Sequence, residues 1–409
     1  MSTDVATASG RGLGAHGSPG RGRLLSIALI VGGQSFQALA SGGIALFLPL
    51  IRTDLGLSFA QAGTLAAAST FVYALMQVPS GLLSDRFDPK RLFVAGLLGT
   101  NLATMLLSVV PSYPGLLAVQ AGSGFFRALV FAPGLMLIRT QFPDNRRATA
   151  MGLFVAGGFS SSIALNLLGP LLVGPLGWRA LFAVFGALGL ATAIAYHWAG
   201  TGVPRRSGHG ATRVRWRVLR HRVVWLTGLI QFVRLALVQG SAAWLPTYVV
   251  VERGQSLSTA GLVVALGAAV TAPANMVGGW LSDRLNRPLA VIGGSLAVLA
   301  ATFAALPAVP GLPALLAVLA VQSVFIQVYF GPLFAVPMQY VDPRGAGLVT
   351  GFGNFCANLG GFACTYLLGA LMDATGSFAT GFGIMAGMAA LALATTLVLA
   401  RWAAAAGRR

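Results

Sequence analysis

Two arginines, Arg127 and Arg234, interrupt long apolar stretches of a chain that is otherwise poor in charge. Each lies roughly 16–20 Å along its stretch at the helical rise of about 1.5 Å per residue. An ionisable side chain inside a membrane-spanning helix costs about 3 kcal/mol or more, so its presence requires a reason. All nine Asp and Glu residues fall in tails, loops or the ends of apolar stretches. Two buried cations without a buried anion predict that a carboxylate or similar oxyanion, which suits the guanidinium fork, arrives as a ligand.

Amide and phenol groups recur at helical spacing in the same kind of stretch. Gln34 and Gln37 share one helix face, and Gln231 shares one with Arg234, because residues three positions apart lie on the same side of a helix. We expect ligand contacts also from four polar residues of later stretches: Gln322, Tyr329, Asn354 and Asn358. The alternatives are hydrogen bonds between helices and, for Arg234, hydrogen bonds to the backbone of a broken helix. Tyr73 is interpreted as a packing residue.

The overall composition favours lipid as the solvent of these stretches. The chain of 409 residues is 56% hydrophobic and 9% charged, against about 25% charged residues in soluble domains. The net charge of +18 also suits a nucleic-acid-binding protein, but the basic residues fall in the short gaps between apolar stretches, as they do in membrane proteins. We therefore expect an integral membrane protein that contacts the lipid bilayer and binds no nucleic acid.

Twelve stretches are long enough, at about 20 residues, to cross a bilayer as helices. They are predicted at 24–51, 59–83, 92–110, 114–138, 148–173, 179–199, 223–250, 258–282, 288–306, 312–338, 346–371 and 378–400. The predicted organisation of this all-α chain is a disordered tail at 1–22, a six-helix bundle at 23–199, a basic linker at 200–222, a second six-helix bundle at 223–402 and a tail at 403–409.

The basic residues also predict the orientation of the chain. Of the 27 Lys and Arg residues, 22 fall in the tails, the linker and the alternate gaps that share a side with them, whereas Arg52, Arg179 and Arg253 fall on the other side. Positively charged loops stay in the cytoplasm. Both termini and the linker are therefore expected to be cytoplasmic.

A repeat divides the chain into two related halves. Leu-Ser-Asp-Arg occurs at 83–86 and again at 281–284, so that Asp85 and Asp283 are 198 positions apart. Four further landmarks recur at nearly the same offset: Pro49 with Pro246, Ala62-Gly63 with Ala260-Gly261, Pro133 with Pro332, and Asp144-Asn145-Arg146 with Asp342-Pro343-Arg344. Parallel repeats of this kind place a substrate site near the bilayer midplane, between the halves.

The first copy of the repeat lies within a longer pattern: Gly81, Leu83, Asp85, Arg86, Lys90 and Arg91. Together with Pro-Asp-Asn-Arg-Arg at 143–147 and Gly-Trp-Arg at 177–179, it resembles the major facilitator superfamily over essentially the whole chain, although Asp88 stands where the family usually has glycine. The resemblance implies a fold of two pseudo-symmetric six-helix bundles, secondary transport by alternating access, and kinship with the organic-anion (anion:cation symporter-like) members.

In that family, helices 1, 4, 7 and 10 line the central cavity, so the resemblance places Arg127 and Arg234 on cavity helices of opposite halves. Many organic-anion members carry an arginine on helix 4, but that family position falls on Ala121, and the companion acid falls near Ala128. The ligand role of Arg127 therefore rests on the cost of burying its charge.

The polar loops are predicted to form a gate rather than a ligand site. A carboxylate at a helix end pairs with arginine or with a helix N-terminus, and such contacts hold one conformation and break in the other. The expected gate residues are Gly81, Asp85, Arg86, Lys90, Arg91, Asp144, Arg146, Asp283, Arg284, Asp342 and Arg344. The alternative for the basic members is that they only anchor the topology.

We expect a monomeric transporter for a small organic anion in a bacterial-type inner membrane, with no cofactor and no metal. Because no acid is buried, exchange or facilitated uptake is favoured, and coupling to a proton or a second anion stays open. A proton-coupled drug exporter is the alternative, since Gly169, Pro170 and Gly174 partly resemble an antiporter motif. A membrane sensor without transport is the alternative from another class. An enzyme is not expected, because the four histidines show no catalytic spacing.

Overall fold

The computed structural model describes residues 21–142, 147–202, 216–341 and 346–406, and these residues form helices joined by turns. The α-helices are α1 (Arg21–Leu55), α2 (Phe59–Arg86), α3 (Pro89–Leu106), α4 (Tyr113–Thr140), α5 (Arg147–Ala199), α6 (Arg222–Thr247), α7 (Leu257–Leu285), α8 (Pro288–Ala305), α9 (Gly311–Val328), α10 (Phe330–Met338), α11 (Ala346–Thr375) and α12 (Phe378–Ala406). Shorter elements are the 3-10 helices η2 (Trp216–Arg220) and η4 (Leu306–Ala308) and the π-helical segment η3 (Tyr248–Glu252).

The described residues contain 10 helical segments that are long and apolar enough to cross a membrane. Two predicted stretches, 148–173 and 179–199, both lie in α5, which is broken between them at Gly177, where φ is +76°. The stretch 312–338, predicted as one helix, is instead divided at Tyr329 into α9 and α10. The division has a local cause, because Pro332 has no N–H to donate to the carbonyl four residues earlier.

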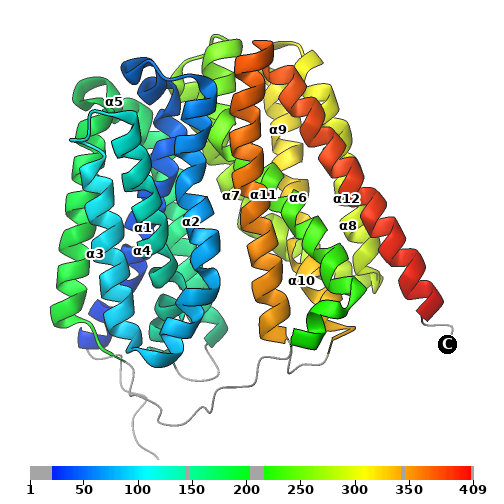
Figure 1. Cartoon of the computed structure of the whole chain (residues 1–409), viewed down its shortest axis with the longest axis horizontal. Helices are drawn as coiled ribbons and strands as arrows, with labels where there is room; N and C mark the ends of the chain where they lie inside the picture. Colours follow the sequence, from blue (N-terminus) through cyan, green and yellow to red (C-terminus); the bar gives the residue numbers. More distant parts are fainter. Residues whose placement is uncertain (1–20, 143–146, 203–215, 342–345, 407–409) are drawn as a thin grey trace, which may run out of the picture.

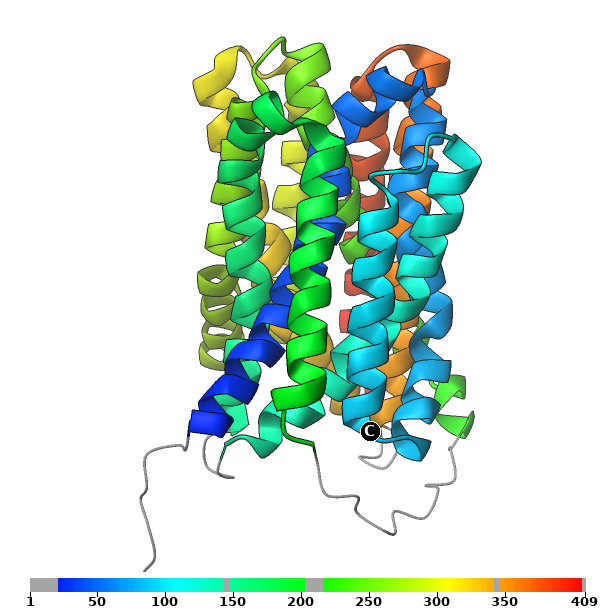
Figure 2. The same cartoon turned by 90° about the vertical axis from the view of Figure 1, so that its left-hand side faces the viewer.

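The helices form two halves that lie side by side, α1–α5 and α6–α12 (Figure 1). The helices run roughly along one direction, and both ends of the described chain lie at the same end of the bundle, the lower end in Figures 1 and 2. We name this end, where α1 begins at Arg21 and α12 ends at Ala406, the terminal face. The other end, where α1 ends at Leu55 and α2 begins at Phe59, is the distal face.

The backbone repeats between the halves at the turns of the distal face. Gly56 and Gly254 have φ values of +60° and +61°. Each lies three residues before a helix, Gly56 before α2 and Gly254 before α7. Gly177 and Gly376 have φ values of +76° and +70°, and each precedes the last helix of its half. Because side chains disfavour positive φ, glycine is required at all four turns. The repeat read from the sequence is therefore also a repeat of backbone conformation.

At the distal face the two halves are in direct contact. The Asp373 carboxylate, near the end of α11, accepts hydrogen bonds from the backbone N–H groups of Phe59 (2.7 Å) and Ala60 (2.6 Å) at the start of α2. A helix N-terminus presents unpaired N–H groups and a partial positive charge, so the carboxylate stabilises it. Phe59 also packs against Trp244 and Phe378 of the second half, with ring centroids 6.1 Å apart in each pair.

Two glycines allow the backbones of the halves to meet. A Cβ atom on Gly261 of α7 would clash with the carbonyl oxygen of Asn166 in α5. A Cβ atom on Gly369 of α11 would likewise clash with the carbonyl oxygen of Phe59 in α2. Backbone contact of this kind, added to the Asp373 contact, packs the halves tightly against each other at the distal face.

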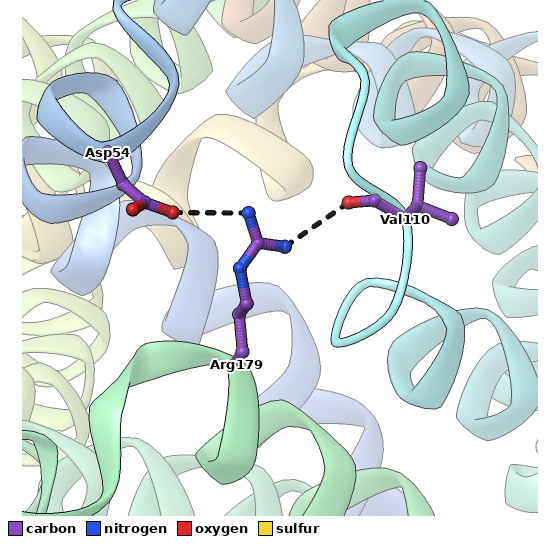
Figure 3. Close-up of polar contacts among 3 residues, drawn as sticks. All are labelled: Asp54, Val110 and Arg179. Atoms are coloured by element: carbon purple, nitrogen blue, oxygen red, sulfur yellow. Dashed lines mark hydrogen bonds and ion pairs between the residues drawn. The ribbon is translucent and has the colours of Figure 1, made fainter.

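A basic residue in each half ties the loops of the distal face together. Arg179 forms an ion pair with Asp54 at 3.1 Å and donates to the carbonyl oxygen of Val110 at 3.2 Å, as Figure 3 shows. In the second half, Arg253 donates to the carbonyl oxygen of Val309 at 2.9 Å. Arg179 and Arg253, two of the three arginines predicted to lie on the less basic side, therefore contact neighbouring loops of their own halves.

Candidate functional site

A cavity with two lobes lies between the halves. The first, with a volume of about 400 Å³, is lined mainly by α1, α2, α4 and α5, with residues of α3, α6 and α11, and we name it the Arg127 lobe. The second, with a volume of about 340 Å³, is lined mainly by α6, α7 and α9, and we name it the Gln322 lobe. Four residues line both lobes, which are therefore adjacent: Phe159, Ser162, Gln239 and Ala242.

The wall of the Arg127 lobe carries one cation and many small polar side chains. Besides Arg127, its polar lining includes Gln34, Ser41, Ser69, Gln120, Ser123 and Ser162. Much of the remaining wall is formed by alanine and glycine, whose small size leaves the polar groups accessible. The lobe therefore offers hydrogen-bond donors and acceptors around one positive charge.

Arg127 is held at the wall of this lobe by two neighbours. Its Nη1 atom donates to the hydroxyl oxygen of Ser41 at 3.0 Å, and its Cζ atom lies 4.5 Å from the centroid of the Tyr73 ring. A cation over an aromatic face is stabilised by the ring quadrupole. Among the described residues, no carboxylate pairs with Arg127. The ion pair that they form joins Arg179 and Asp54. The guanidinium therefore keeps donors available for a ligand.

Arg234 has a similar set of neighbours but a different position. Its Nε atom donates to Oε1 of Gln231 at 3.2 Å, and its Cζ atom lies 4.5 Å from the centroid of the Phe330 ring. Its side chain is 8% exposed, and it lines neither lobe. It lies one helical turn from Val238, which does line the Gln322 lobe, on the side toward the terminal face.

The break between α9 and α10 explains the surroundings of Arg234. Phe330 is the first residue of α10 and supplies the ring over the guanidinium. Tyr329, at the break, is fully buried, and its hydroxyl has no hydrogen-bond partner among the described residues. The alternative reading of the sequence was that Arg234 donates to backbone carbonyls of a broken helix. A helix break does lie beside Arg234, but the hydrogen bond of its Nε atom is to the side-chain amide of Gln231.

The sequence paired Gln34 with Gln37 and Gln231 with Arg234. Among the described residues, a hydrogen bond joins only Gln231 and Arg234. Gln34 lines the Arg127 lobe. Gln37 is buried, and the Oε1 atoms of both Gln34 and Gln37 lack a hydrogen-bond partner. The four residues therefore lie in three places: Gln34 at the wall of the Arg127 lobe, Gln37 buried in α1, and Gln231 with Arg234 buried in α6.

The remaining predicted ligand residues lie in different surroundings. Gln322 lines the Gln322 lobe and is 5% exposed, and its Nε2 atom has no partner among the described residues. Asn358 donates from Nδ2 to the backbone carbonyl of Asn354 at 2.8 Å, a contact within α11. Neither asparagine lines either lobe.

Several residues near the site were not among the ligand residues predicted from the sequence. Tyr73, interpreted as a packing residue, lies over the Arg127 guanidinium. Gln120 and Ser123 line the Arg127 lobe together with Arg127. These three share one face of α4, because they are spaced by three and four residues. That spacing was a signal that the sequence contained, whereas the position of Tyr73 depends on how α2 packs against α4.

The described gate residues make their contacts within their own halves. Lys90 donates from Nζ to the backbone carbonyl of Gly200 at 2.6 Å, and the Cζ atom of Arg284 lies 5.1 Å from the Trp280 ring centroid. Arg91 and Asp283 are exposed. Gly81 lies within α2. The contacts of Lys90 and Arg284 are thus within one half, and the gate role of these residues stays a prediction.

The other predicted gate residues lie outside what the structure describes. Asp144 and Arg146 fall in 143–146, and Asp342 and Arg344 fall in 342–345. Asp85 and Arg86 belong to the last turn of α2, but their side chains are outside the described part of the chain. Their role as a gate stays a prediction.

Comparison with protein families and solved structures identifies the architecture. The family model of the Major Facilitator Superfamily matches residues 30–365 and 256–408. A solved bacterial homologue of the human lysosomal transporter Spinster, in an inward-facing and unoccupied conformation, superposes with a TM-score of 0.79 at 18% identity. The superposition covers 94% of this chain and 98% of the other, so the two share their fold over nearly their whole lengths.

Two relatives match along most of their lengths. The D-galactonate transporter of Escherichia coli O6:H1 is 22% identical over 400 residues, which cover 88% of this chain and 91% of that protein. The probable sulfoacetate transporter SauU of Cupriavidus necator is 26% identical over 393 residues, which cover 85% of this chain and 88% of that protein. Both names refer to organic anions.

Proposed function

The chain belongs to the major facilitator superfamily and is a multi-pass membrane transporter, not an enzyme, and we propose that it carries a small organic anion whose carboxylate or similar oxyanion binds Arg127. The observation that carries the proposal is the unpaired guanidinium at the wall of a cavity of about 400 Å³. A guanidinium binds an oxyanion through two parallel hydrogen bonds. An anionic ligand would therefore supply the charge that no described side chain supplies.

Arg234 is proposed to complete the site from the opposite half. It belongs to α6, next to the part of that helix that lines the Gln322 lobe. When the halves close around the ligand, Arg234 approaches the anion that Arg127 already holds. Binding from both halves gives the ligand a higher affinity for the occluded state, and only such a difference in affinity shifts a conformational equilibrium.

Twelve crossings and cytoplasmic termini remain our inferred topology. The break at Gly177 gives α5 two crossings, and α9 with α10 gives one. With these counts, α1 begins and α12 ends at the terminal face, which also holds Lys90 and Arg284. The positive-inside rule then assigns the terminal face to the cytoplasm, in the inner membrane of a bacterial-type cell.

Alternating access is supported by the difference between the two faces. At the distal face the halves are joined by the Asp373 contact and by the backbone contacts at Gly261 and Gly369. At the terminal face the described residues of the polar motif, such as Lys90, contact only their own half. We infer that the distal contacts break, and contacts from Asp85 and its repeat partner Asp283 form, when the cavity changes sides.

The proposal is tested by flux into proteoliposomes that contain the purified protein. Uptake of gluconate and 3-phenylpropanoate is expected in wild type and is expected to fall by about tenfold or more in Arg127→Gln, since a charge-assisted hydrogen bond contributes about 1.5–3 kcal/mol. Arg401→Gln, which removes an exposed charge in α12, is the matched control and should keep wild-type flux.

Two outcomes would contradict the proposal. Transport of lipophilic cations, with no carboxylate flux, would support the drug-exporter alternative. Carboxylate flux that is equal in Arg127→Gln and wild type would remove Arg127 from the site. The same vesicles also report coupling, at fixed membrane potential with and without a pH gradient: exchange predicts flux without the gradient, and strict dependence on it would exclude exchange.

A further inference from the structure

The two lobes of the cavity differ in chemistry. The Arg127 lobe holds the cation and the hydroxyl and amide groups described above. Half of the residues that line the Gln322 lobe carry large apolar side chains, including Val238, Leu245, Val263, Phe303, Leu319 and Phe382, and the others are small or polar. None of the described residues that line the Gln322 lobe is charged. A ligand that fills both lobes must therefore carry its charge at one end.

The Gln322 lobe is large enough for an organic body of substantial size. An apolar cavity of about 150 Å³ binds a benzene molecule, and this lobe has a volume of about 340 Å³. The anion that Arg127 binds can extend into it directly, because Phe159, Ser162, Gln239 and Ala242 line both lobes. The geometry thus offers an apolar compartment next to the anion site.

One polar group in the apolar lobe is left without a partner. Gln322 is 95% buried, being 5% exposed, and its Nε2 atom has no hydrogen-bond partner among the described residues. An amide buried without hydrogen bonds is costly. A polar atom on the bound molecule would supply the bond that the protein does not.

We propose that the transported anion is amphipathic: an acid whose carboxylate binds Arg127, whose apolar body of about six to nine carbons fills the Gln322 lobe, and which carries one polar atom within reach of the Gln322 amide. This inference rests on the proposed function, since it assumes an anion at Arg127. It separates this chain from a carrier of small hydrophilic anions, because a polyhydroxylated or inorganic anion leaves the apolar lobe without an apolar occupant.

The test compares acids of equal charge and different bodies. Thermal-shift titrations of purified protein with gluconate, acetate, 3-phenylpropanoate and 3-(4-hydroxyphenyl)propanoate give an affinity for each. The two aryl acids are expected to bind about 10- to 50-fold more tightly than acetate and gluconate, because transfer of apolar area from water contributes about 25 cal/mol per Å². Affinity for all four is expected to depend on Arg127.

Two substitutions assign the apolar body to the Gln322 lobe. Ala268→Leu, which adds volume at the wall of that lobe, is expected to weaken both aryl acids about tenfold or more and to leave acetate unchanged. Gln322→Leu is expected to weaken the hydroxyphenyl acid and to strengthen the phenyl acid, because the amide no longer needs a partner. Ala66→Leu, at the wall of the Arg127 lobe, is the matched control and should weaken all four acids.

The outcomes separate this inference from the proposed function. Gluconate that binds as tightly as the aryl acids, in an Arg127-dependent way and insensitive to Ala268→Leu, would overturn the amphipathic substrate and keep the anion transporter. No Arg127-dependent binding of any acid would overturn the proposed function itself. Equal effects of Gln322→Leu on the two aryl acids would remove the polar atom from the inference.

Discussion

Arg127 and Arg234 lie within long apolar helices, and a comparison shows that they have similar neighbours but different surroundings. Each guanidinium lies 4.5 Å from the centroid of an aromatic ring, and each donates one hydrogen bond to a neighbouring side chain, at 3.0 Å for Arg127 and 3.2 Å for Arg234. The environments differ, however. Arg127 lines a cavity of about 400 Å³, whereas Arg234 is 8% exposed and lies against the break between α9 and α10.

The difference teaches that the cost of burying a charge does not by itself identify a ligand site. The aromatic ring and the hydrogen bond stabilise either guanidinium in part. Of the two, Arg127 lines the cavity of about 400 Å³, which an anion can enter in this conformation. Arg234 instead links α6 to a helix break, an element that can change its geometry when the halves move. We therefore expect Arg127 to determine binding and Arg234 to determine the closing step.

The largest effect is expected from removing each arginine in turn. Arg127→Ala should weaken anion binding about 30- to 100-fold, because a hydrogen bond to a charged group contributes about 1.5–3 kcal/mol and more than one is lost. Arg234→Ala should weaken binding less than about fivefold and reduce the transport rate by a larger factor, by making the occluded state less favourable. Thermal-shift affinity and proteoliposome flux, measured on the same variants, separate the two.

Lysine variants provide the control for this comparison. Arg127→Lys keeps the charge and loses the planar fork, so it is expected to recover part of the affinity that alanine loses. Equal losses of affinity in Arg127→Ala and Arg234→Ala would show that both arginines hold the anion in the same state. The distinction between a binding arginine and a closing arginine would then be wrong.

The sequence predicted much of this arrangement, and the limits of the prediction have physical causes. Composition, the loop motifs and the recurrence of Leu-Ser-Asp-Arg were enough to predict the membrane class, the family and the two halves, because all three follow from local sequence pattern. The positive φ of Gly56 and Gly254 repeats the same offset of 198 positions. The division of 312–338 was predictable in principle from Pro332, which interrupts the helical hydrogen-bond ladder.

The site was predicted less completely, because cavity walls depend on how helices rotate against each other. Depth along a stretch is the same kind of information for Arg127 and Arg234, and it cannot show which of them faces open space. Tyr73 and Ser41 became neighbours of Arg127 only through packing of α1, α2 and α4. Asn358, chosen with Asn354 for their spacing, donates to the backbone carbonyl of Asn354 within α11, and the ligand role of both stays a prediction.

An intermediate effect is expected from the two aromatic rings. Tyr73→Leu removes the ring over Arg127, and a cation–π contact contributes about 0.5–2 kcal/mol, so anion affinity should fall about three- to tenfold. Phe330→Leu removes the ring over Arg234 and should change the transport rate with little change in affinity. Tyr73→Phe and Phe330→Tyr keep the rings and serve as controls with near-wild-type behaviour. A larger loss of affinity in Phe330→Leu than in Tyr73→Leu would reverse the proposed roles.

The smallest effect is expected from the two hydrogen-bond partners, and it tests how each guanidinium is oriented. Ser41→Ala removes the acceptor of Arg127 Nη1, and because a neutral partner contributes a net of about 0.5–1.5 kcal/mol, affinity should fall about two- to fivefold. Gln231→Leu removes the acceptor of Arg234 Nε and leaves a buried charge with fewer bonds, so it should lower the melting temperature of the ligand-free protein more than Ser41→Ala does. Ser41→Thr, which keeps the hydroxyl, is the control for binding. If Gln231→Leu weakened binding more than Ser41→Ala, with no loss of stability, Arg234 would be in contact with the anion in this conformation, and the closing role would pass to other residues.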